Sequence, residues 1–118
     1  MKLKICSLLI LLGAALAGCR SPYIETDIVN NSGAALRLIE VDYPSASFGK
    51  QSLDPRTTYH YHFKIQGSGQ ITISFTDAAG KIHNATGPEL KEGQHGPLTI
   101  SVDSSANVAW SQHLETAQ

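Results

Sequence analysis

Two histidines one residue apart stand in the clearest strand-like segment of the sequence, TTYHYHFKI at residues 57–65. Side chains at positions i and i+2 of a strand project from the same face, about 7 Å apart. Imidazole nitrogens are common ligands of zinc and copper, so His60 and His62 could share one transition-metal ion. The alternative is a solvated strand face that carries two histidines and binds no metal.

A shared ion needs a third ligand, for which His83 and His95 are candidates. If the strands follow one another as a meander, segment 70–77 separates 57–65 from 81–86. The outer faces of the two flanking strands are then about 9–10 Å apart, too far for nitrogens that each lie about 2 Å from a metal. His95 falls in a polar loop. Metal binding is therefore the alternative hypothesis, and copper delivery is disfavoured because Met1 is the sole methionine.

Glu40 and Asp42 form a second pair at strand spacing, and paired carboxylates can catalyse glycoside hydrolysis. The pair is predicted to face water beside Arg37, with nothing apolar to raise the pKa of one carboxyl as acid catalysis requires. The sequence contains no G-x-S-x-G nucleophile motif. We therefore expect a charged sheet face and no enzyme.

The N-terminal segment has the three parts of a secretory signal. Lys2 and Lys4 supply the positive charge, an apolar run begins at Ile5, and small residues follow up to Gly18. The 14 residues of this run are fewer than the roughly 20 that a membrane-spanning helix needs. We expect residues 1–18 to form a signal helix that is removed.

The end of this segment, Leu16-Ala17-Gly18-Cys19, resembles the lipobox of bacterial lipoproteins. That resemblance implies a diacylglyceryl thioether on Cys19, cleavage just before it and acylation of the new α-amine. Cys6 would be removed with the signal, so Cys19 would have no cysteine with which to form a disulfide. The alternative is an ordinary signal peptide with an accidental cysteine. No cofactor other than this lipid is expected.

The predicted mature chain keeps 100 residues, with seven basic and ten acidic side chains. It has no basic patch for nucleic acid, so the expected partners are the membrane, through the lipid, and an envelope protein. Residues 19–22 form a short tether, and Arg20 departs from the Asp that follows the lipidated Cys in lipoproteins retained at the inner membrane. In a host with two membranes, that difference favours the outer membrane, at its periplasmic face or on the cell surface. In a host with one membrane, the domain would face outward from the cytoplasmic membrane.

Period-two alternation of apolar and polar residues continues through the mature chain, with Gly, Pro, Asn and Ser clusters between the segments. Leu36 to Tyr43 changes phase halfway, which predicts a β-bulge at Leu38-Ile39 that turns both apolar sets inward. The pattern predicts an antiparallel, immunoglobulin-like β-sandwich over residues 23–112, followed by a polar tail at 113–118. Parallel pairing is not expected because no crossover helix is available, and a small barrel stays open as an alternative. The expected strands, about seven, lie at 23–29, 36–43, 57–65, 70–77, 81–86, 98–103 and around Val108 and Trp110.

Most aromatic residues are expected in the core, and two long segments are expected to be irregular loops. The loops span 44–56 and 87–97, and loops are where binding residues concentrate. The alternative for Phe48 and Leu53 is that they simply plug the core. We therefore expect a lipid-anchored binding or scaffolding module without catalysis. The expected core aromatics are Tyr59, Tyr61, Phe63, Phe75 and Trp110, and the candidate partner-binding residues are Phe48, Leu53, Glu89, Lys91 and His95.

Overall fold

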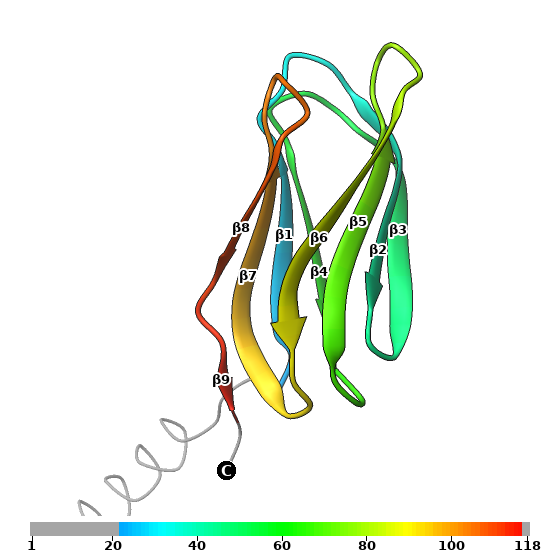
Figure 1. The fold of residues 1–118 in the computed structure, drawn as a ribbon. Coiled ribbons are helices and arrows are strands. Elements are labelled where there is room, and N and C mark those ends of the chain that lie inside the picture. Colours follow the sequence, from blue (N-terminus) through cyan, green and yellow to red (C-terminus); the bar gives the residue numbers. More distant parts are fainter. Residues whose placement is uncertain (1–21, 117–118) are drawn as a thin grey trace, which may run out of the picture.

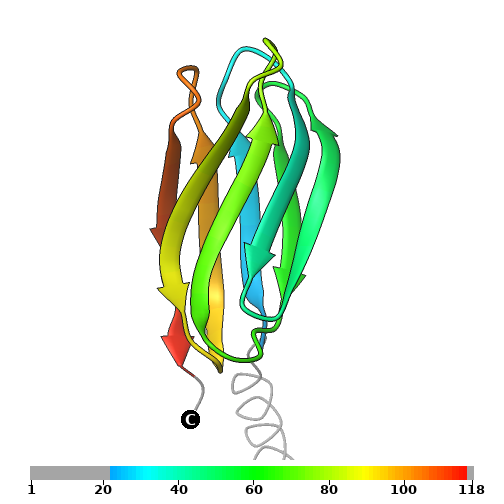
Figure 2. The ribbon, with the colours of Figure 1, turned by 45° about the vertical axis from the view of Figure 1, so that its right-hand side comes forward.

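A computed structural model describes residues 22–116, which form two β-sheets packed face to face (Figures 1 and 2). The first sheet has the order β4-β1-β7-β8, and the short β9 also pairs with β7. The second sheet has the order β3-β2-β5-β6. The strands are β1 (Ile24–Asn30), β2 (Leu36–Tyr43), β3 (Ala46–Leu53), β4 (Thr58–Phe63), β5 (Gly69–Thr76), β6 (Ile82–Leu90), β7 (Gln94–Val102), β8 (Val108–Gln112) and β9 (Glu115–Thr116).

The core lies between the two sheets and is supplied by alternate residues of the strands, as the period-two patterns predict. Phe63 and Phe75 are buried as predicted, whereas Tyr59, Tyr61 and Trp110 are partly exposed and pack against the core from its sides. Among residues 22–116, the buried apolar residues lie between positions 24 and 102. They are Ile24, Ile28, Leu36, Ile39, Val41, Phe48, Leu53, Phe63, Ile65, Ile71, Ile73, Phe75, Leu90, Leu98, Ile100 and Val102.

The predicted bulge in β2 is confirmed, but its effect on Leu38 is the reverse of the prediction. The register of β2 against β5 shifts between Arg37 and Glu40. Leu38 adopts a left-handed conformation with φ of 49° and is 64% exposed, while Ile39 is buried. The extra residue thus turns Ile39 into the core and expels Leu38 to solvent.

Both segments predicted as long loops are mostly strand, so that prediction is wrong. Residues 46–53 form β3, an edge strand whose polar side chains face water while its backbone pairs with β2. In the second predicted loop, 87–97, β6 continues to Leu90 and β7 begins at Gln94, which leaves a turn of three residues. The Gly87-Pro88 step lies at a register shift of the edge strand β6, where a missing backbone N–H is tolerated.

The exclusion of parallel pairing is also wrong, because β1 and β7 pair in parallel from Ile24↔Gly96 to Asn30↔Val102. No helix makes this connection; five strands, β2 to β6, lie between the two in the chain. The meander is wrong too, since β4 leaves its sequence neighbours and pairs with β1 in the other sheet. The described residues contain nine strands, more than the seven expected, because β3 and β9 were not foreseen.

The predicted signal helix, the lipobox and Arg20 lie outside the described residues. Within residues 22–116, no helix is long and apolar enough to cross a membrane. Inside the predicted polar tail, Glu115–Thr116 forms β9 against β7.

Candidate functional site

The pairing of β1 with β4 places two carboxylates beside the two predicted metal-ligating histidines. In the antiparallel register, Glu25 lies opposite His62 and Asp27 lies opposite His60. All four side chains point to the outer face of the first sheet, because the residues that alternate with them in β1 are buried. We call these four residues the histidine face.

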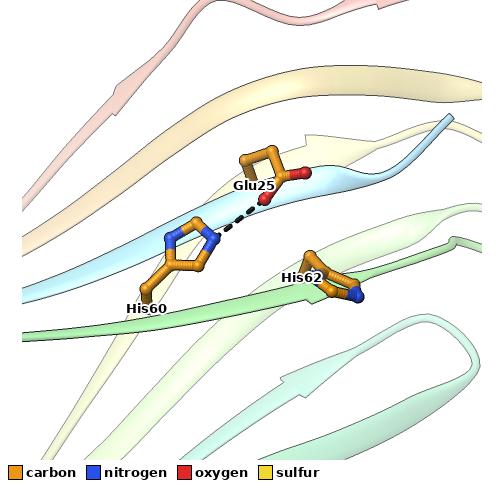
Figure 3. A group of neighbouring side chains, drawn as sticks. All are labelled: Glu25, His60 and His62. Carbon is orange, nitrogen blue, oxygen red and sulfur yellow. Dashed lines mark hydrogen bonds and ion pairs between the residues drawn. The ribbon is translucent and has the colours of Figure 1, made fainter. Parts of the chain in front are cut away.

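His60 contacts both carboxylates of this face. Its Nε2 lies 2.9 Å from Oε2 of Glu25 (Figure 3). Its Nδ1 lies 2.7 Å from Oδ1 of Asp27. The hydrogen bond with Asp27, and then that with Glu25, raises the pKa of His60 above its ordinary value. An imidazolium can donate an N–H to each carboxylate at once, which is why the charged form is favoured. The His60 side chain is 53% exposed, so solvent screens these ion pairs.

Glu25 completes a three-residue group that the sequence did not reveal. One possible ligand atom from each of Glu25, His60 and His62 lies within 4.8 Å of the other two. The ring of His62 packs on Tyr23, with ring centroids 4.6 Å apart. Alternation within β1 could have marked Glu25 as outward-facing, but only the β1–β4 pairing places it near the histidines.

The two histidines considered as third ligands lie elsewhere. His83 belongs to the second sheet, where its Nε2 lies 2.7 Å from Oδ2 of Asp77. His95 is on β7 and lines a hollow of about 290 Å³ together with His113, and Glu25 lines the same hollow. Glu25 is therefore the third possible ligand, in place of His83 and His95. It comes from β1, which the predicted meander did not place next to β4.

The other predicted site residues are dispersed over the surface or lie in the core. Glu40 and Asp42 are exposed on β2, in the other sheet from the histidine face. Phe48 and Leu53 are buried, which confirms the alternative that they plug the core. Three candidate partner-binding residues stand at or next to the short β6–β7 turn: Glu89, Lys91 and His95.

A second feature, which the sequence did not indicate, is an open cavity of about 480 Å³. We call it the distal cavity. The turns that line it lie at the end of the sandwich opposite the start of β1 and the short β9 (Figure 1). Leu36 and Val102 are buried among its lining residues, and three turns surround it, at 31–35, 77–81 and 103–107.

Two of these turns have the same design, which fixes the rim of the distal cavity. Oδ1 of Asp77 accepts hydrogen bonds from the backbone N–H groups of Ala79 and Lys81, both at 2.9 Å. Asp103 does the same in the 103–107 turn. The hydrogen bond to His83, and then that from the Lys81 backbone, lowers the pKa of Asp77. In each of these Asx turns, the Asp side chain hydrogen-bonds backbone N–H groups of its own turn and so holds the turn in shape.

Comparison with known proteins supports the architecture and nothing finer. No protein-family model and no curated protein matches the sequence. Among solved structures, the chain is similar to a protein from Eubacterium rectale whose structure was determined by NMR, with a TM-score of 0.56 and 12% sequence identity. The similarity covers 80% of this chain and 93% of the other. The chain is therefore an all-β protein with two sheets in a sandwich-like arrangement.

Proposed function

We propose that this protein is a bacterial lipoprotein whose immunoglobulin-like sandwich acts as a binding or scaffolding module at the cell envelope, without catalysis. The observation that carries the proposal is the sequence Leu16-Ala17-Gly18-Cys19 behind a charged and then apolar leader. Two sheets packed face to face over an apolar core match the architecture of such modules. The described residues contain no cysteine, so the proposed domain has no inter-sheet disulfide.

An anchor at Cys19 would hold the sandwich in one orientation relative to the membrane. The start of β1 lies at one end of the sandwich, and the turns that line the distal cavity lie at the other (Figure 1). The three residues between Cys19 and Tyr23 span only about 10 Å even when extended. A strand as long as β7, with nine residues, spans about 30 Å. The distal cavity would thus open away from the membrane, at a height of about the length of the sandwich. The residue after the proposed lipidated cysteine, Arg20, supports our proposal that the protein is sorted to the outer membrane.

Two properties of the distal cavity suit a partner-binding role. It is open to solvent. Its lining combines apolar side chains with the charged Lys81 and the hydroxyl groups of Ser104 and Ser105. Concave apolar surfaces with a few polar groups are the usual form of binding sites.

The anchor can be tested by measuring whether Cys19 is lipidated in the processed protein. We expect the protein from cells to have the intact mass of a chain that begins at Cys19 and carries lipid, and to fractionate with membranes. Replacement Cys19→Ser should abolish lipidation and membrane association. Cys6→Ser is the matched control, because it changes a cysteine of the leader and should leave processing intact. An unmodified Cys19 in the processed protein would refute the anchor.

The binding surface can be tested separately in cells with a photo-crosslinking amino acid. Placed at Ala79 or Ser104 on the rim of the distal cavity, it should capture a specific envelope protein. Placed at Glu40, on an exposed position of the second sheet, it should not. Equal capture from both places, or capture from Glu40 alone, would move the binding surface away from the distal cavity.

A further inference from the structure

We propose that the histidine face is a binding site for one divalent transition-metal ion, with Glu25, His60 and His62 as its protein ligands and zinc as the expected metal. This site is independent of the distal cavity and of the lipid anchor, because all three ligands come from the outer face of β1 and β4. Within residues 22–116 it is the single group in which three such ligand atoms lie within 4.8 Å of one another.

The donor set determines the class of metal. Two imidazole nitrogens and one carboxylate oxygen form a three-ligand zinc site that leaves the fourth position of the tetrahedron to water. Residues 22–116 contain neither Cys nor Met, so the soft ligands that favour Cu(I) are absent from the described chain. Copper(II) and nickel(II) prefer imidazole ligands as well and are expected to compete with zinc in a test tube.

The ligand atoms of Glu25, His60 and His62 need to move only a short distance to coordinate zinc. Zinc bonds of about 2.0–2.1 Å place tetrahedral ligand atoms about 3.3 Å apart, compared with the present limit of 4.8 Å. The backbone under the site is held by the β1–β4 ladder, which pairs residues 24–29 with 58–63. His60 and His62 are exposed, so rotation of their side chains can close the group without moving the sheet.

The contacts of His60 already present the nitrogen that a metal would use. Its Nδ1 hydrogen-bonds Asp27, which holds the hydrogen on that nitrogen and directs Nε2 towards Glu25 at 2.9 Å. An ion bound between Nε2 and the Glu25 carboxylate would take the place of the proton that now links them. A carboxylate behind the ligating imidazole is the usual arrangement at zinc sites, where it fixes the tautomer and the ring orientation. Asp27 is therefore a positioning residue.

A solvated surface ion pair explains less of this arrangement than a metal site does. One carboxylate would be enough to pair with His60, and exposed pairs of that kind stabilise proteins little. Here two imidazoles and two carboxylates occupy two neighbouring cross-strand pairs, so that both His60 and His62 lie beside Glu25. The ring of His62 also packs against Tyr23.

The test is a zinc titration of the full 118-residue chain in detergent, against a chromophoric chelator and near neutral pH. The chain carries no polyhistidine tag, and Cys6 and Cys19 are replaced by Ser so that no thiolate competes. We expect one zinc ion per chain. His60→Ala, His62→Ala and Glu25→Gln should each lower the affinity by about tenfold or more. Thermal unfolding without metal should show that each variant folds, since these side chains are outside the core.

His83→Ala and His113→Ala are the matched controls, because they remove imidazoles that the proposal does not use. Both should bind zinc as the parent chain does. X-ray absorption at the zinc edge should show two imidazole ligands in the parent chain and one in His60→Ala. Asp27→Asn should weaken binding while the two-imidazole signature remains.

Three results would overturn the assignment. The first is less than one ion per chain, and the second is an affinity that survives both His60→Ala and His62→Ala. The third is a loss caused by His113→Ala as large as that caused by His60→Ala, which would place the ion in the hollow lined by His95 and His113.

Discussion

Asn30 is the buried polar residue that joins the end of β1 to the rim of the distal cavity. It is completely buried, and its Nδ2 lies 2.9, 3.0 and 3.2 Å from the carbonyl oxygens of Ala34, Leu53 and Asp54. Its Oδ1 accepts hydrogen bonds from the backbone and side chain of Ser32. We predict that Asn30→Asp, which preserves shape and changes one donor group into an acceptor, strongly destabilises the fold.

The expected loss is about 3–5 kcal/mol at neutral pH. An intramolecular hydrogen bond contributes about 1 kcal/mol net, and the two hydrogens of Nδ2 serve three carbonyl groups. Removing them costs about 2 kcal/mol, and leaving those buried acceptors opposite a carboxylate oxygen adds about 1–3 kcal/mol. This is a large fraction of the roughly 5–15 kcal/mol that stabilises a typical domain.

The loss should depend on pH in a definite direction. Burial among carbonyl oxygens would raise the pKa of the new carboxyl in the folded state above its unfolded value of about 3.9. The variant is then most stable below that unfolded value, where a protonated carboxyl can donate one hydrogen bond. Its stability falls as the pH rises through the folded-state pKa.

Urea denaturation of residues 22–118 at several pH values measures these differences. The matched control is Asn31→Asp, an exposed position next in the chain, which should stay within about 0.5 kcal/mol of the parent. A loss below about 1 kcal/mol for Asn30→Asp at neutral pH, or a loss that grows in acid, would refute the reasoning.

Three further predictions concern a tight contact, a strained residue and a titrating group. A Cβ at Gly87 would lie 2.6 Å from Cε3 of Trp110, so Gly87→Ala should cost about 1–3 kcal/mol in urea denaturation, and an unchanged midpoint would contradict this contact. Leu38 has a φ of 49° and is exposed, so Leu38→Gly should stabilise the fold by up to about 1 kcal/mol in the same assay; destabilisation would contradict the strain argument. NMR titration of His60 should give a pKa above 6.5 that falls in Asp27→Asn, and an unchanged value would argue against that hydrogen bond. Because the pKa of His60 is raised by folding, its stabilising contribution is complete below its unfolded pKa and is lost as the pH rises through its folded pKa.

Strands with regular alternation could be predicted from the sequence, and strands at the sheet edges could not. Ile71, Ile73 and Phe75 face the core in β5 because every second residue of a central strand must be buried. β3 and the end of β6 are edge segments with many polar side chains, so their backbone pairing leaves little trace in residue type. Phe48 and Leu53 were the apolar signal of β3, but a loop that plugs the core would show the same residues.

The two histidines of the candidate metal site could be predicted from the sequence, and the carboxylate could not. The His-x-His spacing follows from strand geometry alone, because it depends on two residues of a single strand. Glu25 lies 35 positions from His60 in the chain, and its place beside the histidines depends on which strand pairs with β4. A meander and the observed pairing are equally compatible with the local alternation, and only the observed pairing makes a three-ligand group.

The sequence by itself determined the period of the strands, most of the residues that enter the core and the position of the bulge in β2, and it predicts an anchor point at Cys19. These depend on neighbouring residues, whose side chains and backbone act on one another directly. The tertiary structure alone decided the parallel pairing of β1 with β7, the transfer of β4 to the first sheet, the histidine face and the distal cavity. Each of these brings together segments far apart in the chain, and their arrangement is set by burying the apolar faces of both sheets in one core.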